Sequence, residues 1–245
     1  MKKQPLLNTY VNNIDMKETV QAIDNMIVTG KKSYIVPINV DVVIKIEKDP
    51  YLKRIIDSAD MVLVDGKPLI WISNWYKRPI KEKISGSDLV PLLCRKAVKK
   101  GYTIFILGGK EGIAEKAKFN LEKNLPDIKI VGTYAPPFGF EKNQDELNKI
   151  NQMITEVHPD LLIVCFGCPK QEKWIYENYE KYDAKVSICA GATVDFLSGN
   201  VSRAPQWMCN HGLEWFFRFI QEPKRMFKRY FIDDTKIIKL IWKYK

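Results

Sequence analysis

The stretch LLIVCFGCPKQEKW, Leu161 to Trp174, decides the fold of this chain of 245 residues. An apolar run ends at Cys165, and after Phe-Gly-Cys the sequence turns at once into the polar residues PKQE. A short run that is apolar at every position predicts a strand buried on both faces, as in a parallel sheet. Proline is favoured in the first turn of a helix, so Pro169 predicts that a helix comes next. The stretch therefore indicates a strand that leads directly into a helix.

Further short apolar runs alternate with helical patterns along the chain. The expected strands are 33–38, 61–64, 103–107, 128–132, 161–166 and 186–190. Helices are expected from a D-x-x-E start at Asp15 and Glu18 to Gly30, through about residue 57, from a cap at Ser87 to Gly101, over 111–124 and 145–156, and from Pro169. This alternation predicts an α/β, Rossmann-like fold with a mostly parallel sheet covered by helices on both faces.

The pattern changes near Arg203, where the sequence becomes helical, aromatic and basic without a strand signal. The formal net charge is +10, and residues 218–245 hold nine Lys or Arg against three Asp or Glu. We therefore expect a Rossmann-like catalytic domain over residues 1–202 and a helical, basic C-terminal appendage over residues 203–245. The appendage carries most of the excess positive charge.

Five cysteines and two histidines limit the classes of function. An odd number of dispersed cysteines does not form a secreted disulfide framework, so a reducing cytoplasm is expected. The C-x-x-C of Cys165 and Cys168 has no second pair of ligands to complete a zinc site, and both thiols are expected to be small buried groups. We find no signal peptide and no apolar run of about eighteen residues, so no membrane-spanning helix is expected.

Polar residues and glycines follow the expected strands at their carboxyl ends, where parallel sheets bind ligands. They are Asn39, Asp65-Gly66, Gly108-Gly109, Gly167 to Glu172, and Gly191 with Asp195. Lys170 and Gln171 should project from a helix N-terminus beside its free amides, a place suited to a phosphate or a sugar hydroxyl. Asp65 could accept a proton from a hydroxyl as a general base, or it could form an ordinary Asp-Gly turn. Asp195 likewise has two possible roles: its side chain could hydrogen-bond a nucleotide, or it could cap a turn.

Two other classes of function fit part of the pattern. A NAD-dependent Rossmann oxidoreductase would use the same sheet, but LGGKEG is not the G-x-G-x-x-G fingerprint. A non-catalytic membrane or nucleic-acid adaptor would use the basic tail alone and would leave the polar strand ends unexplained. None of the usual nucleic-acid-binding motifs is present, so no nucleic-acid partner is expected.

These motifs together resemble the WecG/TagA/CpsF family of bacterial glycosyltransferases, from about Asp15 to Tyr230. The stretches that carry the resemblance are VDGKPLIW, ISGSDLVPLL, IFILGGKEGIAEKA, IVGTYAPPFGF, PDLLIVCFGCPKQEKWI, GATVDFLSGNVSRAPQWM and GLEWFFRFIQEPKRMFKRY. The resemblance implies an inverting enzyme that moves a sugar from a UDP-sugar, often UDP-N-acetylmannosamine, to a polyprenyl-diphosphate-linked sugar at the inner face of the cytoplasmic membrane. Such transfer serves the synthesis of cell-surface polysaccharide or teichoic acid.

The resemblance also implies roles for single residues. Asp65 matches the proposed catalytic base, and Gln171 and Asn39 match residues of the active site. Pro37 stands where the family usually has threonine, so this chain lacks one hydroxyl that could contact the donor sugar.

Inversion requires one deprotonated hydroxyl that attacks in line with a departing diphosphate, so one base and one electropositive cradle are enough. No D-x-D sequence is present to hold a metal on the diphosphate, and neither a metal nor another cofactor is expected. We expect the cradle for the UDP-sugar to come from glycine amides, helix N-termini and polar or charged side chains, namely Gly66, Gly108, Gly109, Lys170, Gly191, Asp195 and Arg203.

The basic tail has two interpretations. Arg218, Arg225 and Arg229 are interleaved with aromatic residues, which is typical of a segment that lies on an anionic membrane and meets a lipid diphosphate. Alternatively, the tail is an ordinary helix that packs its aromatic rings on the body. We favour the membrane interpretation, because positive charge and aromatic content rise together. It predicts a cytoplasmic protein that associates peripherally with the inner face of the cell membrane, and it leaves a homo-oligomer open.

Overall fold

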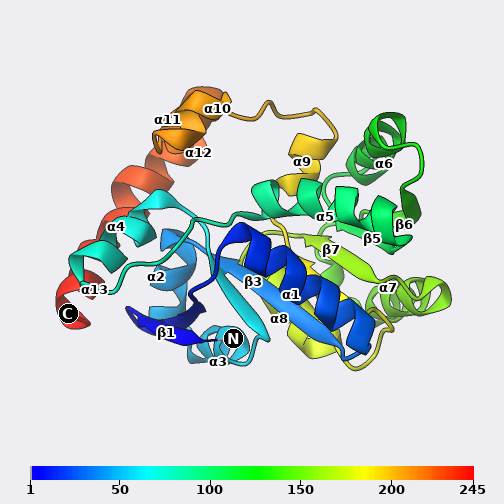
Figure 1. Cartoon of the computed structure of the whole chain (residues 1–245), viewed down its shortest axis with the longest axis horizontal. Coiled ribbons are helices and arrows are strands. Elements are labelled where there is room, and N and C mark those ends of the chain that lie inside the picture. Colours follow the sequence, from blue (N-terminus) through cyan, green and yellow to red (C-terminus); the bar gives the residue numbers. More distant parts are fainter. Residues whose placement is uncertain (1) are drawn as a thin grey trace.

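The structure is a computed structural model that describes residues 2–245, except for the side chains of Gln206, Asn210 and Arg225. Its centre is a six-stranded sheet in the order β4-β3-β8-β7-β5-β6 (Figure 1), and all of its neighbouring strands run parallel. The strands are β3 (Ser33–Ile38), β4 (Met61–Val64), β5 (Thr103–Gly108), β6 (Lys129–Tyr134), β7 (Leu161–Cys165) and β8 (Val186–Cys189). The predicted α/β fold and its six strands are confirmed.

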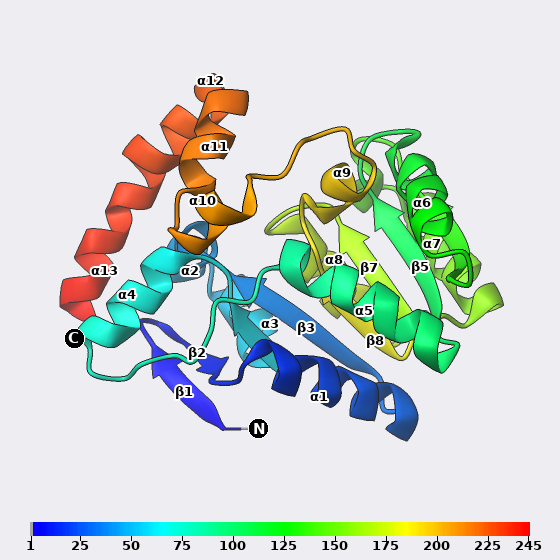
Figure 2. The same cartoon turned by 45° about the horizontal axis from the view of Figure 1, so that its top comes forward.

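Helices cover both faces of this sheet, as predicted. One face carries α1 (Met16–Thr29), α5 (Gly86–Lys100) and α6 (Ile113–Asn124). The other carries α2 (Val40–Lys48), α3 (Pro50–Asp57), α7 (Gln144–Val157) and α8 (Lys170–Asn178). Figure 2 shows α1 and α5 in front of the strands and α8 behind them. The two layers explain why the strands are apolar at nearly every position, since each face of the sheet is buried.

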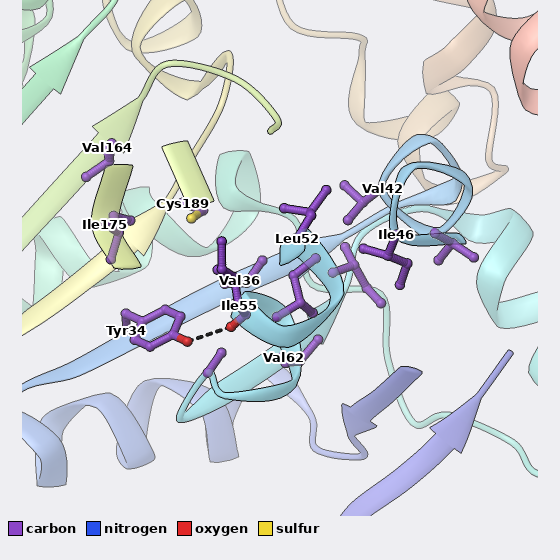
Figure 3. Packing of buried hydrophobic residues seen from close by; sticks show 14 of the residues in the cluster. Tyr34, Val36, Val42, Ile46, Leu52, Ile55, Val62, Val164, Ile175 and Cys189 are labelled. Atoms are coloured by element: carbon purple, nitrogen blue, oxygen red, sulfur yellow. Dashed lines mark hydrogen bonds between the residues drawn. The ribbon is translucent and has the colours of Figure 1, made fainter. Parts of the chain in front are cut away.

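Successive residues of each strand pack into different cores because side chains alternate across a strand. In β3, Ile35 packs with the α1 and α5 layer, whereas Tyr34 and Val36 pack with α2 and α3. Figure 3 shows the second core, in which the hydroxyl of Tyr34 donates a hydrogen bond to the carbonyl of Ile55. This bond satisfies a buried polar group inside an otherwise apolar layer.

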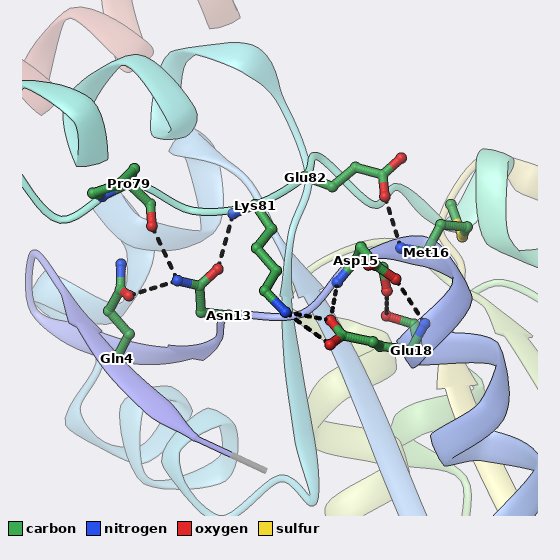
Figure 4. A network of polar contacts seen from close by, with 9 residues as sticks. Gln4, Asn13, Asp15, Met16, Glu18, Pro79, Lys81 and Glu82 are labelled. Carbon is green, nitrogen blue, oxygen red and sulfur yellow. Dashed lines mark hydrogen bonds and ion pairs between the residues drawn. The ribbon is translucent and has the colours of Figure 1, made fainter.

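The start of α1 follows the predicted D-x-x-E pattern. The carboxylate of Asp15 accepts from the backbone nitrogen of Glu18 at 2.8 Å, and Glu18 accepts from the backbone nitrogen of Asp15 at 2.8 Å (Figure 4). Lys81 pairs with Glu18 at 2.7 Å, and Asn13 bonds to the chain on either side of Ile80. This network fastens the start of α1 to the segment that precedes α5.

Three local expectations need correction or addition. The helix expected to begin at Ser87 is capped by Ser85 instead, because the Ser85 hydroxyl accepts from the backbone nitrogen of Asp88 at 3.1 Å. The helical stretch through residue 57 is two helices, which break where Asp49 precedes Pro50. An antiparallel hairpin of β1 (Lys3–Leu6) and β2 (Thr9–Asn12) was not predicted.

The remaining elements are short and lie at or beyond the carboxyl ends of the strands. They are α4 (Lys67–Trp75), η1 (Phe140–Lys142), α9 (Thr193–Leu197), α10 (Gln206–Asn210), α11 (Glu214–Gln221), α12 (Pro223–Phe227), η2 (Lys228–Asp233), η3 (Asp234–Lys236) and α13 (Ile237–Lys243). Residues 203–245 contain helices and, in their described backbone, no strand, as predicted. Their separation as a domain at residue 203 stays a prediction.

The appendage is fastened to α4 and α2. The hydroxyl of Tyr76 donates to the carbonyl of Ile241 at 2.6 Å, and Lys243 pairs with Glu47 at 2.6 Å. Figures 1 and 2 both show α13 alongside α4. The last helix is therefore held against α4 and α2.

Candidate active site

The predicted site residues follow the carboxyl ends of the strands, and these ends share one edge because the strands are parallel. Asp65 follows β4, Asn39 follows β3, Gly191 follows β8, Gln171 follows β7 and Gly109 follows β5. Figure 2 shows β3, β5 and β7 pointing to the same side of the molecule. Asp65 and Gln171 thus follow strands whose ends share one edge, and these strands, β4 and β7, lie three strand spacings apart, or about 14 Å.

A cleft of about 1060 Å³ opens at this edge beside β5, β6 and β7. Its lining residues are Gly109, Lys110, Glu111, Gly112, Glu115, Tyr134, Ala135, Pro136, Pro137, Phe138, Phe140, Cys165, Phe166, Lys170 and Asp195. Three residues expected at a UDP-sugar, Gly109, Lys170 and Asp195, belong to this wall. Clefts of several hundred to about 1000 Å³ typically hold small ligands.

Lys170 brings positive charge to the cleft. Its ammonium group lies 3.0 Å from Oε2 of Glu141 and sits over the rings of Phe138 and Phe140, at 5.3 and 5.4 Å from their centroids. Phe138 itself is fully exposed, at 102%. The wall thus offers an uncovered aromatic ring, which suits a flat base, and it carries two lysines, Lys110 and Lys170, against three carboxylates, Glu111, Glu115 and Asp195.

Gln171 links two loops of this edge. It is buried, and its side-chain oxygen accepts from the backbone nitrogens of Gly167 at 3.2 Å and Gly191 at 3.0 Å. Its side-chain nitrogen donates to Oε1 of Glu172 at 2.9 Å. Gln171 therefore joins the loop after β7 to the loop after β8. Its side-chain oxygen accepts two hydrogen bonds, one from each loop.

Glu172 lies beneath Gln171 and is completely buried. Burial raises the pKa of this carboxyl above its ordinary value, and hydrogen bonds from the Gln171 amide and the Cys168 thiol oppose the rise. Burying a carboxylate costs free energy unless its oxygens are hydrogen-bonded, so a buried Glu172 calls for a structural explanation. Orienting the Gln171 amide is such an explanation.

The two cysteines of the C-x-x-C are free thiols. Cys165 is buried, and this burial raises the pKa of its thiol to about 12, so almost no thiolate exists at neutral pH. Cys168 is only partly buried, and burial also raises the pKa of its thiol. Full burial is thus confirmed for Cys165 and is wrong for Cys168.

The glycines at the edge have different roles. Gly108 has a φ of +111°, and a Cβ there would lie 2.7 Å from the carbonyl oxygen of Cys165, so this glycine permits the close approach of β5 and β7. It does not line the described cleft, unlike Gly109. Gly66 begins α4 with a φ of +117°, and Gly191 is held by Gln171.

Asn39 and Pro37 lie at the end of β3. The Asn39 side-chain oxygen caps α2 by accepting from the backbone nitrogen of Val42 at 3.2 Å. Pro37 pairs with Leu63 of β4, and the pairing of β3 with β8 ends two residues earlier, at Ile35. Proline is tolerated there because no hydrogen bond to β8 requires its missing N–H.

Asp65 is partly buried among charged side chains. Burial raises the pKa of its carboxyl above the ordinary value; the positive charges of Lys83 and Arg218 oppose this rise, and the negative charges of Glu214 and Asp88 add to it. A carboxylate whose pKa is raised accepts a proton more readily than an ordinary aspartate. The position thus suits a general base.

The charges around Asp65 are themselves paired. Lys83 lies 2.8 Å from Asp88 and 3.4 Å from Glu214, and Arg203 forms an ion pair with Asp88. Burial alone would raise the pKa of Asp88, but hydrogen bonds from Lys83 and other partners lower it to about 2. Arg203 therefore belongs to the group around Asp65, and it does not line the cleft with Gly109 and Asp195.

The structure places two of the three tail arginines. The guanidinium of Arg218 lies over the Phe196 ring, 5.1 Å from its centroid, and Arg229 lies 3.9 Å from Asp234. The side chain of Arg225 lies outside the described residues. Both described arginines are partly buried, with Arg218 on the side of the appendage that faces the site edge.

Sequence reasoning missed several residues of this edge. Lys83, Asp88 and Glu214 surround Asp65, although the first two lie in or beside the motif ISGSDLVPLL. Tyr134 and Phe138 line the cleft and belong to the loop TYAPPFGF. That loop follows a predicted strand, so the rule that ligands bind at the carboxyl ends could have found it.

The described residues contain neither a metal-binding cluster nor a membrane-spanning helix. No group of three or more His, Cys, Asp or Glu is placed to hold a metal ion among residues 2–245 as described. Within the same residues, no helix combines the length and the apolar character needed to cross a membrane.

Comparison with known proteins identifies the family. Proteins named N-acetylglucosaminyldiphosphoundecaprenol N-acetyl-beta-D-mannosaminyltransferase from Bacillus spizizenii and Bacillus subtilis are 29% and 31% identical over 196 and 188 residues. These matches cover 80% and 77% of this chain and 74% and 71% of the relatives. The sequence model of the glycosyl transferase WecG/TagA/CpsF family matches residues 4–245. The chain is a glycosyltransferase that belongs to the WecG/TagA/CpsF family.

Proposed function

We propose that this glycosyltransferase moves a sugar from a UDP-sugar to a polyprenyl-diphosphate-linked sugar, with inversion and without a metal ion. The observation that carries the proposal is the placement of Asp65, a carboxylate with a raised pKa, on the same sheet edge as the cleft. A base and a ligand cleft on one edge allow donor and acceptor to meet over the strands between them.

The cleft is the proposed site for UDP. Phe138 and Tyr134 offer rings to the uracil base, Asp195 offers a carboxylate to the ribose hydroxyls, and Lys170 offers positive charge to the diphosphate. Backbone nitrogens near Gly109 and Gly191 can add hydrogen bonds, because glycine lets a ligand approach the backbone closely. The sugar would then extend along the edge toward β4.

Asp65 is the proposed base. It takes the proton from a hydroxyl of the acceptor sugar, and that oxygen forms a bond to the anomeric carbon as the bond from this carbon to the β-phosphate oxygen breaks. The electron pair of the broken bond leaves with UDP. Attack from the side opposite the leaving group inverts the anomeric carbon, so a single carboxylate at Asp65 is sufficient.

The names of the relatives suggest the two sugars. They describe transfer of N-acetylmannosamine to N-acetylglucosaminyldiphosphoundecaprenol. We extend this chemistry to the present chain in a coarser form, with N-acetylmannosamine or a related hexose as the donor sugar, because Pro37 removes a hydroxyl that the family usually carries. The product would serve cell-surface polysaccharide or teichoic acid synthesis.

A lipid-linked acceptor places the enzyme at a membrane. We propose that the appendage rests on the anionic inner face of the cell membrane, because residues 218–245 combine positive charge with exposed aromatic rings such as Phe227 and Phe231. The alternative, in which the appendage only packs on the body, accounts for Arg218 and Arg229 but leaves those exposed rings without a role.

The test is direct. The protein is incubated with a panel of UDP-sugars and a synthetic lipid-diphosphate sugar, and products are identified by mass spectrometry with the anomeric configuration assigned by NMR. Transfer with inversion supports the proposal, and retention or the absence of transfer with every donor contradicts it. Calorimetry with UDP separates it from a non-catalytic adaptor, which would not bind the nucleotide, and calorimetry with NAD tests the oxidoreductase alternative.

A further inference from the structure

Exposed large hydrophobic side chains are concentrated in one region of the described structure. Eleven of the sixteen such side chains belong to α4 or to residues 207–242. The other five are scattered over the body. Scattered exposed side chains are common in soluble proteins, but a concentration of them marks an interaction surface.

Helix α4 has one buried and one exposed apolar face. Leu69 and Ile72 are buried in the core, whereas Trp71 and Trp75 are 57% and 48% exposed. Residues four apart lie on the same side of a helix, so the two tryptophans form one stripe. Tryptophan is a costly side chain to leave in water, and two of them on one stripe call for a partner.

Helix α13 repeats this arrangement. Leu240 is buried, while Ile238 and Trp242, again four residues apart, are 57% and 65% exposed. The rings of Trp75 and Trp242 meet edge to face with their centroids 5.6 Å apart. Figures 1 and 2 both show the two helices side by side. We call the combined surface the tryptophan face, and it consists of Trp71, Trp75, Ile238 and Trp242.

Positive charges dominate around the tryptophan face, although Lys243 is paired with Glu47 of α2. Residues 66–81 and residues 235–245 contain four Lys or Arg each and no Asp or Glu. Lys77, Arg78 and Lys239 are exposed, and the ammonium group of Lys245 lies 5.0 and 5.3 Å from the ring centroids of Trp75 and Trp242. A second copy of this chain would bring like charges together at such a surface, whereas an anionic surface would complement it.

We propose that the tryptophan face docks on an anionic lipid bilayer, with its rings at the level of the headgroups. Tryptophan is enriched at this depth because its ring is apolar and its N–H is polar, and lysine and arginine near the surface are attracted to anionic lipids. The inference rests on the membrane association proposed above and deepens it, because it assigns membrane contact to α4, a helix of the body, together with α13 and independently of the tail arginines.

This docking would set the height of the active site above the membrane. Helix α4 begins immediately after Asp65 and Gly66, and Trp71 lies about 8 Å further along the helix axis. A bilayer that receives Trp71 would thus lie close to the candidate base. The diphosphate of a lipid-linked acceptor, which cannot leave the headgroup layer, would be presented at this position.

The experiment compares vesicle binding of the full chain and of the variant Trp71→Ala/Trp75→Ala. Vesicles are phosphatidylcholine alone or phosphatidylcholine with phosphatidylglycerol, and binding is measured by co-sedimentation over a range of lipid concentrations. We expect the double variant to bind the anionic vesicles at least tenfold more weakly. Both side chains are half-exposed, so their removal should leave the fold intact, as circular dichroism checks.

Phe119→Ala is the matched control, because this ring is 65% exposed but lies on α6. It should bind the vesicles like the unchanged protein. Brominated lipids give a second measurement, since Trp71, Trp75 and Trp242 should be quenched by bromine near the headgroups, whereas the buried Trp174 should not.

Two outcomes would overturn the inference. One is undiminished binding of the double variant to the anionic vesicles. The other is a dimer in sedimentation velocity, without lipid, that the double variant loses, since this would make the face an interface between copies. Transfer to a water-soluble acceptor analogue should be unchanged by Trp71→Ala/Trp75→Ala, so a failure of docking can be told from a failure of the proposed reaction.

Discussion

The side-chain oxygen of Gln171 lies 3.0 Å from the backbone nitrogen of Gly191, and this bond joins the loop after β7 to the loop after β8. The same oxygen accepts from Gly167, and Glu172 fixes the orientation of the amide by accepting from its nitrogen. Phe166, in the loop after β7, and Asp195, in the helix α9 that follows the loop after β8, line the cleft. We therefore expect the buried amide group of Gln171 to hold these two parts of the wall in place.

Replacing Gln171 with alanine should raise the KM for the UDP-sugar about tenfold or more. The partly buried backbone nitrogens of Gly167 and Gly191 lose their acceptor, and each lost bond costs about 1 kcal/mol. Glu172→Gln should have a smaller effect of the same kind, because it keeps an oxygen to accept from Gln171. Initial rates over a range of donor concentrations give both values.

The control for the Gln171 variant is Gln152→Ala, which removes an exposed bond to Glu156 on α7. Its KM should match that of the unchanged protein. An unaltered KM in Gln171→Ala would show that the bonds to the two glycines do not shape the donor site.

Replacing Asp65 with asparagine should lower turnover about 100- to 10,000-fold, because asparagine cannot take a proton from the acceptor hydroxyl. The Kd for UDP should change less than about twofold, since the cleft lies beside β5, β6 and β7, at the far end of the same edge from β4 and Asp65. Product formation by mass spectrometry and calorimetry with UDP measure the two effects. Asp127→Asn, an exposed aspartate between α6 and β6, should be fully active.

The pH profile of turnover should report the environment of Asp65. A base must be deprotonated to act, so activity should fall on acidification through the pKa of Asp65, which burial raises above that of an ordinary aspartate. Lys83→Met removes a positive charge and should move this acidic limb to higher pH. Glu214→Gln removes a negative charge and should move it to lower pH. Shifts in the same direction for both variants would exclude Asp65 as the titrating group.

A chelator should not change the initial rate. We base this on the cradle proposed above, in which Lys170 and backbone amides balance the charge of the diphosphate. The rate is measured with and without EDTA, and again after Mg²⁺ or Mn²⁺ is added to the treated protein. Loss of activity with EDTA and its recovery with either ion would disprove metal independence.

Neutralising exposed lysines of the appendage should weaken binding to anionic vesicles. Lys224→Gln/Lys228→Gln removes two positive charges that the membrane proposal places at the bilayer, each worth about 1 kcal/mol, or about fivefold in binding. The effect should fade as salt is raised, because salt screens such attraction. Lys99→Gln/Lys100→Gln, at the exposed end of α5, is the charge-matched control and should bind normally.

The sheet could be predicted from the sequence because five of its strands, β3, β4, β5, β7 and β8, are buried on both faces and therefore largely apolar over consecutive residues. The sixth, β6, lies at the edge of the sheet and exposes Lys129 and Val131. The position of Asp65, Asn39 and Gln171 on one edge followed, since parallel strands place their carboxyl ends together. The β1–β2 hairpin could not be predicted in this way. Its residues are mixed in polarity, and it is held by long-range bonds such as the one that the backbone nitrogen of Val62 donates to the side-chain oxygen of Asn12.

The group around Asp65 could not be predicted either. Lys83 and Asp88 lie five residues apart near the start of α5, but Arg203 and Glu214 belong to the appendage. The full group therefore forms only when the appendage meets the start of α5. Gly108, in contrast, was predicted as a site residue, although packing alone explains it. Its place at a strand end suggested a ligand contact, but the approach of Cys165 accounts for the glycine by packing alone.

Because the sheet is parallel, the amino-terminal ends of its strands lie away from the candidate site and can be used to attach the enzyme to a surface or a label. The turn at Asp127 precedes β6 at the amino-terminal end of that strand, and it is exposed. A single cysteine introduced there could be coupled to a biosensor surface or a fluorophore. Immobilised through this turn, the protein would present its cleft to the solution, so that substrate capture could be followed in real time.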